Sequence, residues 1–250
     1  MKHDARSSLV ETPAKLTRAS KGQLIGESEG KAIYHSRRPD LVIQEFTSEG
    51  GKKGSRARDL SALRNEISSY LFGYIEGFHI PTHFVSKLSA TSMVVKRTDN
   101  IPMTMRIYNT ATGSLMKRLG LRERIPLEFP IIEHFFNAGK RPPTWMNEYH
   151  MYALNIVTPE ELKQMNRLAS KVNAVLRSLC DRRKFFVADL QLAFVRFKEQ
   201  ILIGDELSPV TCHFIDLSGD GKRDEDKYSP EQENAVEMFS ELYQRLRVKA

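Results

Sequence analysis

Two adjacent acids in the stretch GDELSPVTCHFID, residues 204–216, are the first candidates for chemistry. Asp205 and Glu206 follow an apolar run and precede a Ser-Pro break. A carboxylate at the end of a strand suits a hard cation such as Mg²⁺, which takes one or two protein carboxylates and completes its shell with phosphate oxygens and water. Asp189, in the preceding predicted strand, could face the same site. The alternative is that these are solvated acids in turns, and the pattern alone favours that alternative.

A glycine-bearing loop, GESEGKAIY, is the second candidate. Gly26, Gly30 and Lys31 precede a predicted strand. Backbone N–H groups of such a turn can bind phosphates, and a nearby lysine adds a point charge. The alternative is an ordinary hairpin turn, which a motif this short favours.

A third candidate is NTATGSLMKRLG, where a predicted strand turns into a short helix. Asn109 ends the strand, Gly113 and Ser114 begin the helix, and Lys117 lies in its first turns. A helix N-terminus with free N–H groups favours an anion. A serine N-cap with solvated basic residues explains the same pattern, and both interpretations stay open.

The pattern along the chain predicts an α+β fold. Apolar residues at i, i+3 and i+4 spacing predict a helix over 59–78, and Thr158, Pro159 and Glu161 begin a second helix over 159–183. Further helices are expected at 113–120 and from 229 to the end, with strands at 31–36, 40–46, 80–89, 92–97, 101–109, 185–197 and 200–206. We therefore expect a loose tail at 1–20, a β-rich lobe at 21–100 and a mixed lobe at 101–250, with a cleft between the lobes as a place for a ligand.

The composition limits the class of protein. The 250 residues are 40% hydrophobic and 28% charged, with a net charge of +7. No apolar stretch approaches the roughly 20 residues that span a bilayer, and residues 1–15 lack the apolar core of a secretory signal. We expect a cytoplasmic protein without a membrane partner, in which Cys180 and Cys212 are packing residues. The short basic clusters lack interleaved aromatics, so a site for phosphorylated metabolites explains the charge without nucleic acid.

Four motifs, in one order along the chain, resemble the SAICAR synthetase family. They are HIPTHF, VVKRTDNIPMTMRIYNTATGSLMKRLG, FVADLQLAFV and GDELSPVTCHFID, within residues 26–246. The resemblance implies that family's two-lobe α+β fold, with a nucleotide cleft between the lobes, and an ATP- and Mg²⁺-dependent ligase of purine biosynthesis. Such an enzyme would join an imidazole nucleotide carboxylate to the amine of aspartate through an acyl phosphate.

The resemblance also assigns residues, and those assignments are expectations. It implies ATP-binding residues Gly26, Lys31, Met93 and Lys96, substrate-binding residues Asn109, Ser114, Lys117 and Asp189, and a magnesium ligand at Asp205, with Asp205 and Lys96 catalytic. The implied partners are small molecules, namely the carboxylate and the amine. A homo-oligomer is compatible with the sequence.

The sequence also departs from the family's pattern. A second acid of the metal site is replaced by Ala193, and an arginine by Tyr108. Other departures are Thr104, Gln191, Val210, His213, Glu225 and Ser229. Losing two hydrogen bonds to charged groups costs about a hundredfold or more in binding, so the alternative is a catalytically impaired member that binds nucleotide or regulates. Arg106 lies two residues before Tyr108 on the same strand face, so we expect it to replace the missing arginine at the substrate.

Overall fold

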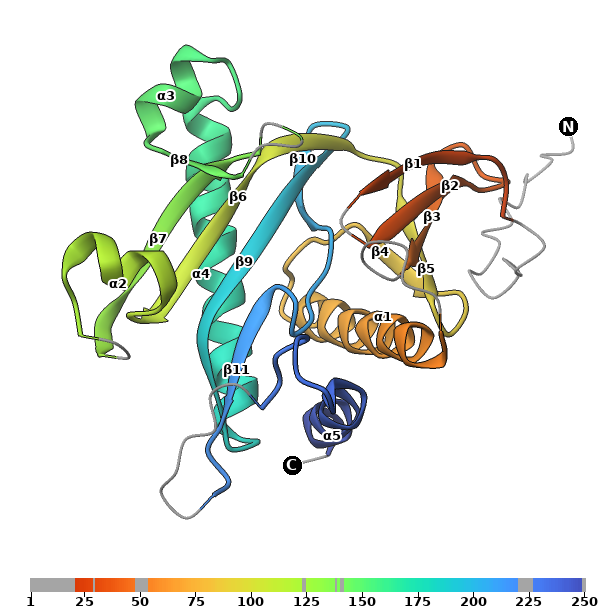
Figure 1. The fold of residues 1–250 in the computed structure, drawn as a ribbon. Helices are drawn as coiled ribbons and strands as arrows, with labels where there is room; N and C mark the ends of the chain where they lie inside the picture. Colours follow the sequence, from red (N-terminus) through yellow and green to blue (C-terminus); the bar gives the residue numbers. More distant parts are fainter. Residues whose placement is uncertain are drawn as a thin grey trace, which may run out of the picture.

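A five-stranded antiparallel sheet forms the N-terminal part of the protein. The computed structural model describes residues 21–28, 30–47, 54–122, 125–137, 139, 142–219 and 227–248. The strands of this sheet are β1 (Leu24–Ser28), β2 (Lys31–His35), β3 (Leu41–Phe46), β4 (Phe84–Lys87) and β5 (Ser92–Lys96). Their order is β1-β2-β3-β5-β4, and Figure 1 shows the sheet beside the long helix α1.

A six-stranded antiparallel sheet forms the rest. Its strands are β6 (Asp99–Thr110), β7 (Pro126–Phe136), β8 (Thr144–Met146), β9 (Phe185–Phe197), β10 (Gln200–Gly204) and β11 (Cys212–Asp216). The order is β10-β9-β6-β7-β8, and β11 also pairs with β9. β6 pairs with one edge of β9. On the other edge, β10 pairs with residues 193–197 of β9 and β11 pairs with residues 185–190. Residues 205–211 connect β10 to β11, and they form a loop that extends from this edge of the sheet.

Helices cover the two sheets. They are α1 (Ser55–Glu76), α2 (Gly113–Leu119), α3 (Glu148–Ala153), α4 (Pro159–Asp181) and α5 (Ala235–Arg247). α4 crosses one face of the six-stranded sheet, and α5 lies beside α1 (Figure 1). The apolar stripe of α4 is buried in one hydrophobic cluster that includes residues of both sheets. The α+β fold class is therefore confirmed.

Several sequence predictions hold and several are wrong. Thr158 and Glu161 form the predicted capping box of α4, and both cysteines are buried in the core as packing residues. The last helix begins at Ala235 and not at 229, because residues 229–234 form turns. Phe78 lies beyond the end of α1 and is 44% exposed, although the helix was expected to reach it.

Five elements were not predicted. They are β1, β7, β8, β11 and α3. Every residue of β1 is exposed and most of β7 is exposed or half-buried, so neither shows the alternation that identifies a strand. The predicted tail at 1–20 lies outside the described residues, and the two-domain division stays a prediction. None of the helices in the described ranges is long and apolar enough to cross a bilayer.

The capping box of α4 gives the first prediction. Thr158 Oγ1 accepts the Glu161 N–H at 3.1 Å, and Glu161 Oε2 accepts the Thr158 N–H at 2.9 Å. Replacing an N-cap threonine with alanine costs about 1 kcal/mol. We expect Thr158→Ala to lower the free energy of unfolding in urea by that amount, and Thr158→Ser to preserve it. Equal losses in both variants would contradict the capping role.

Candidate functional site

The loop between β10 and β11 carries the two candidate acids away from the sheet. Asp205 has a left-handed backbone with φ 64°, a conformation that aspartate tolerates better than most residues. Gln44 of β3 donates to the Asp205 carbonyl at 3.0 Å. The turn therefore points from the six-stranded sheet toward the five-stranded one.

Glu206 is the centre of a buried ionic network. Its side chain is 0% exposed. Arg64 of α1 binds it with two hydrogen bonds, Nε to Oε1 at 2.8 Å and Nη2 to Oε2 at 2.7 Å. Lys31 donates to Oε2 at 3.1 Å, and the Ser208 hydroxyl donates to Oε1 at 2.5 Å. Burial alone would raise the pKa of Glu206, but Lys31 and Arg64 hold it below its usual value, so the carboxylate is ionised.

Lys31 joins both acids. Its Nζ lies 2.5 Å from Asp205 Oδ1, and its side chain is only 9% exposed. Burial would lower the pKa of Lys31, but Asp205 and Glu206 raise it, so the ammonium stays charged. Lys31, Arg64, Asp205 and Glu206 are called the carboxylate cluster below. The cluster brings together two predicted site residues, Lys31 and Asp205.

Lys96 and His83 lie near this cluster. Lys96 Nζ donates to the Thr82 carbonyl at 2.7 Å. Burial, with Lys96 and Lys31 nearby, lowers the pKa of His83 to about 3, so its ring is neutral. Neither ring nitrogen of His83 has a hydrogen-bond partner among the described residues. Met93 is wholly buried in the core, so its side chain offers no surface to an adenine ring.

A second ionic cluster lies on the six-stranded sheet. Asp189 of β9 accepts two hydrogen bonds from Arg106 of β6, at 3.0 Å from Nε and 2.8 Å from Nη2. Its other oxygen accepts the Thr112 hydroxyl at 2.8 Å and lies 3.3 Å from His213 Nδ1. These four residues are called the Asp189 cluster. Arg106 and His213 are about one-third exposed, so the cluster opens to solvent on their side.

The pKa of Asp189 limits what it can do. Burial would raise it, but hydrogen bonds from His213, Arg106 and Thr112 lower it to about 2. Such a carboxylate is a weak base at neutral pH. It therefore orients the arginine and the histidine and does not accept protons.

Strand alternation explains which face carries the Asp189 cluster. Ile107 and Asn109 point toward α4, where the Asn109 amide exchanges two 2.8 Å hydrogen bonds with Asn173. Arg106 lies on the opposite face. Asn109 is 3% exposed and its amide is occupied by protein groups, so the structure gives no support to its substrate role.

The remaining predicted residues are not members of either cluster. Gly26 was expected in a loop but lies within β1, opposite Ile33. Lys117 is exposed on α2. Ser114 is in the first turn of α2, and its side chain lies outside the described part of the chain. Their roles stay predictions.

β9 runs past both clusters. Ala193 pairs with Gly204, the residue before Asp205, and Asp189 lies four residues earlier on the same strand. At about 3.3 Å per residue, the two positions are about 13 Å apart along β9. One extended small molecule, or two bound end to end, would span that distance.

The donor set at Asp205 does not fit a metal ion held by the protein. The described residues contain no group of three or more His, Cys, Asp or Glu that could hold one. Both oxygens of Glu206 are occupied, Asp205 is paired with Lys31, and the position opposite Gly204 is Ala193. The magnesium assignment at Asp205 therefore stays a prediction that these contacts do not support.

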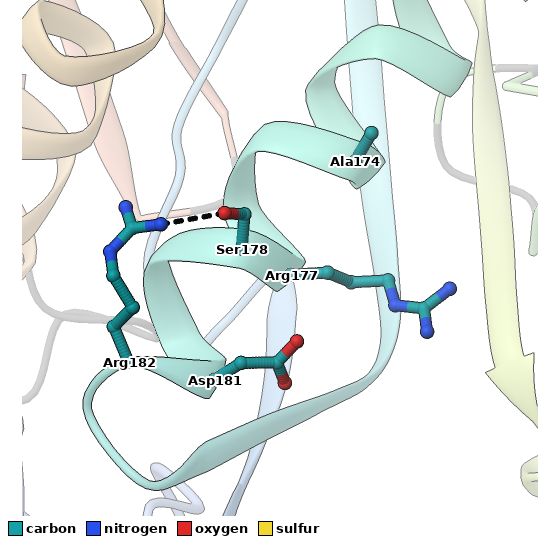
Figure 2. A pocket seen from close by; sticks show the side chains of 5 residues that line it. All are labelled: Ala174, Arg177, Ser178, Asp181 and Arg182. Atoms are coloured by element: carbon teal, nitrogen blue, oxygen red, sulfur yellow. Dashed lines mark hydrogen bonds between the residues drawn. The ribbon is translucent and has the colours of Figure 1, made fainter.

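Two hollows on the surface include no residue of the clusters. One of about 400 Å³ is lined by Ala174, Arg177, Ser178 and Asp181 of α4 and by Arg182, which follows the helix. Figure 2 shows Arg182 turned to Ser178 while Arg177 points away from it. A smaller one, about 200 Å³, lies between α4 and the sheet face that carries Ile107. Because neither includes a residue of the two clusters, we do not assign the site to them.

Sequence reasoning missed three residues of the site. Arg64 was overlooked although polar residues recur on the buried face of α1, at Ser61, Arg64, Asn65 and Ser68. A charged residue on a buried helix face requires a partner, which was the available signal. Thr112 and His83 gave no such signal, because their contacts depend on the tertiary fold.

The fold and these clusters define a two-sheet α+β protein with charged sites suited to small anionic ligands. The model of the SAICAR synthetase family matches residues 27–242, and the chain belongs to that family. The family consists of ATP-dependent ligases of purine biosynthesis.

Individual relatives agree over nearly the whole chain. A phosphoribosylaminoimidazole-succinocarboxamide synthase of Chlorobium phaeobacteroides is 36% identical over 231 residues, which is 91% of this chain and 98% of the relative. The corresponding crystal structure from Ehrlichia chaffeensis has a TM-score of 0.81 at 29% identity, over 91% of this chain and 100% of that one. A SAICAR synthetase in complex with ADP has a TM-score of 0.79 at 27% identity, over 90% and 97%.

The carboxylate cluster gives a stability prediction. Glu206→Gln keeps the shape of the side chain but removes its negative charge, so the buried cations Arg64 and Lys31 lose the carboxylate that they share. Breaking a buried ion pair from one side costs about 3–5 kcal/mol, so we expect a loss of about that size in urea denaturation. Asp40→Asn is the matched control, because it breaks the exposed Arg38–Asp40 pair and should cost less than about 1 kcal/mol. Similar losses in the two variants would contradict the central role of Glu206.

The Asp189 cluster gives a pH prediction. Its carboxyl has a pKa of about 2 in the folded protein, below the usual value near 4, so the unfolded chain takes up the proton first. The stabilisation is fully present above about pH 4 and is lost as the pH falls toward 2. We expect the urea midpoint of the wild type to fall more steeply over that range than the midpoint of Asp189→Asn. Parallel curves would contradict the assignment.

Proposed function

We propose that this protein is an ATP-dependent ligase that activates a carboxylate as an acyl phosphate and joins it to an amine. A carboxylated aminoimidazole ribonucleotide and aspartate are the pair that the family resemblance implies. One observation carries the proposal, namely two ionic clusters whose nearest positions on β9, Ala193 opposite Gly204 and Asp189, are about 13 Å apart along the strand. One cluster offers cations for phosphates, and the other offers groups for a second substrate. The ADP bound to a 27% identical SAICAR synthetase supports nucleotide binding, and we assign the nucleotide to the first cluster.

The reaction has two steps. A carboxylate oxygen of the first substrate attacks the γ-phosphorus of ATP, and ADP leaves with the electrons of the broken P–O bond. The amine nitrogen then attacks the acyl carbon, inorganic phosphate leaves, and the nitrogen loses a proton. Both steps move negative charge between phosphate oxygens, so fixed cations lower their barriers.

The clusters supply groups for both steps. Lys31 and Lys96, which both lie close enough to His83 to lower its pKa, are the cations that we assign to the phosphates. Arg106 and His213, held by Asp189, face the second substrate and suit an anionic group such as a carboxylate. Because Lys31 already pairs with Asp205, the positive charge that faces the phosphates would come from the lysines.

A nucleotide-binding protein without catalysis is the second candidate. The observation that favours it is that both carboxylate oxygens of Asp189 are already hydrogen-bonded within the protein, to Arg106, Thr112 and His213. A protein of this kind would bind ADP and ATP alike and release no product.

Turnover separates the two candidates. We expect ADP release in a coupled assay only when ATP, a carboxylate and an amine are all present, first with the imidazole nucleotide and aspartate and then with a panel of each. Lys96→Met should lower the rate at limiting ATP about tenfold or more, because a hydrogen bond to a charged group is lost. The control is Lys163→Met, which changes an exposed lysine of α4.

Two results would count against the ligase. Binding of ADP by calorimetry with no turnover for any pair would leave the second candidate. No binding of either nucleotide would remove both.

A further inference from the structure

The carboxylate cluster shows which cation balances the charge of its two acids, and the inference drawn from this rests on the proposed nucleotide function. We propose that the Lys31 ammonium takes the place of a divalent cation at Asp205 and Glu206. Nucleotide phosphates would then bind through Lys31 and Lys96, with no metal ion held by the protein.

Glu206 has no capacity left for a metal ion. A carboxylate has about four lone-pair positions. Arg64 takes two of them, Ser208 a third and Lys31 the fourth. A cation could bind Glu206 only by displacing Arg64 or Lys31, and this would leave a charge buried without a partner.

Asp205 is the more exposed acid, and its charge is already balanced. Its side chain is 31% exposed, with Lys31 Nζ 2.5 Å from Oδ1. The two cations Lys31 and Arg64 match the two anions Asp205 and Glu206, so the cluster has no net negative charge. A divalent ion at Asp205 would meet the Lys31 ammonium within a few ångströms, and the repulsion is strong in a partly buried site.

The lysines keep donors for phosphate oxygens. An ammonium has three N–H groups. Lys31 uses two of them, on Asp205 and Glu206, and Lys96 uses one, on the Thr82 carbonyl. Counting only contacts among the described residues, three N–H groups remain for an anion, and in the proposal these ammonium groups, not a bridging metal, contact the phosphates.

Metal binding to the protein alone is the first test. Mn²⁺ replaces Mg²⁺ in oxygen sites and gives an electron paramagnetic resonance signal that falls when the ion is bound. We expect the full-length protein to leave the signal of millimolar Mn²⁺ unchanged. Loss of signal with a dissociation constant well below millimolar would overturn the inference.

Nucleotide affinity is the second test. In calorimetry, ADP should bind with affinities that agree within about threefold in EDTA and in millimolar Mg²⁺, because a metal that bridged ADP to Asp205 would add at least one charged contact and about tenfold. Binding that Mg²⁺ strengthens tenfold or more would overturn the inference and leave the nucleotide function intact. If ADP does not bind at all, the proposed function fails, and the Mn²⁺ measurement still decides whether a metal site exists.

A designed metal site is the third test. Lys31→Met frees Asp205 while Arg64 still pairs with Glu206, and Ala193→Glu adds a carboxylate opposite Gly204. We expect the double variant to bind Mn²⁺ and to bind ADP more tightly with Mg²⁺ than with EDTA. Lys163→Met combined with Ala193→Glu is the matched control and should bind no Mn²⁺. A Mn²⁺ site in the control would show that Lys31 does not block the metal.

Discussion

The buried carboxylate of Glu206 is the interaction on which the arrangement of the two sheets depends. It belongs to the loop after β10, yet its partners are Lys31 of β2 and Arg64 of α1. An ionised carboxylate with no exposed surface is tolerated only when its lone pairs are filled, so these contacts fix how the loop meets the first sheet. Backbone bonds support the same junction, since His83 N–H donates to the Ile203 carbonyl and Ile203 N–H to the Pro81 carbonyl.

The contacts of Glu206 are possible because β10 and β11 pair with successive parts of the same edge of β9, which leaves a loop between them. Had β10 continued along that edge, Asp205 and Glu206 would have paired within the sheet. Instead the chain turns through the left-handed Asp205 and returns as β11. The loop carries the two acids of the carboxylate cluster, and the Asp189 cluster includes residues of β6, β9 and β11. Alternation along β6 and β9 then separates the Asp189 cluster from the face that packs on α4.

Much of the fold was predictable from the sequence, whereas the pairing of the site residues was not. The capping box at Thr158 and the apolar stripe of α4 are local signals, so that helix was predicted nearly to its ends. β1 is exposed throughout and carries no alternation, so it was missed. The acids Asp189 and Asp205 were found, but their partners Arg106, Thr112 and Lys31 lie far away in sequence, and only the tertiary fold identifies the pairs.

The chain belongs to the SAICAR synthetase family, and its Lys31 forms ion pairs with Asp205 and Glu206. The family supplies the ATP-dependent ligase class, and the contacts of Lys31 with Asp205 and Glu206 are the basis of the proposed phosphate site. A crystal structure grown with ADP and Mg²⁺ tests this most directly. We expect phosphate oxygens within hydrogen-bond distance of the Nζ atoms of Lys31 and Lys96, with the Lys31–Asp205 ion pair still formed. A metal ion coordinated by Asp205, or ADP bound away from both lysines, would contradict it.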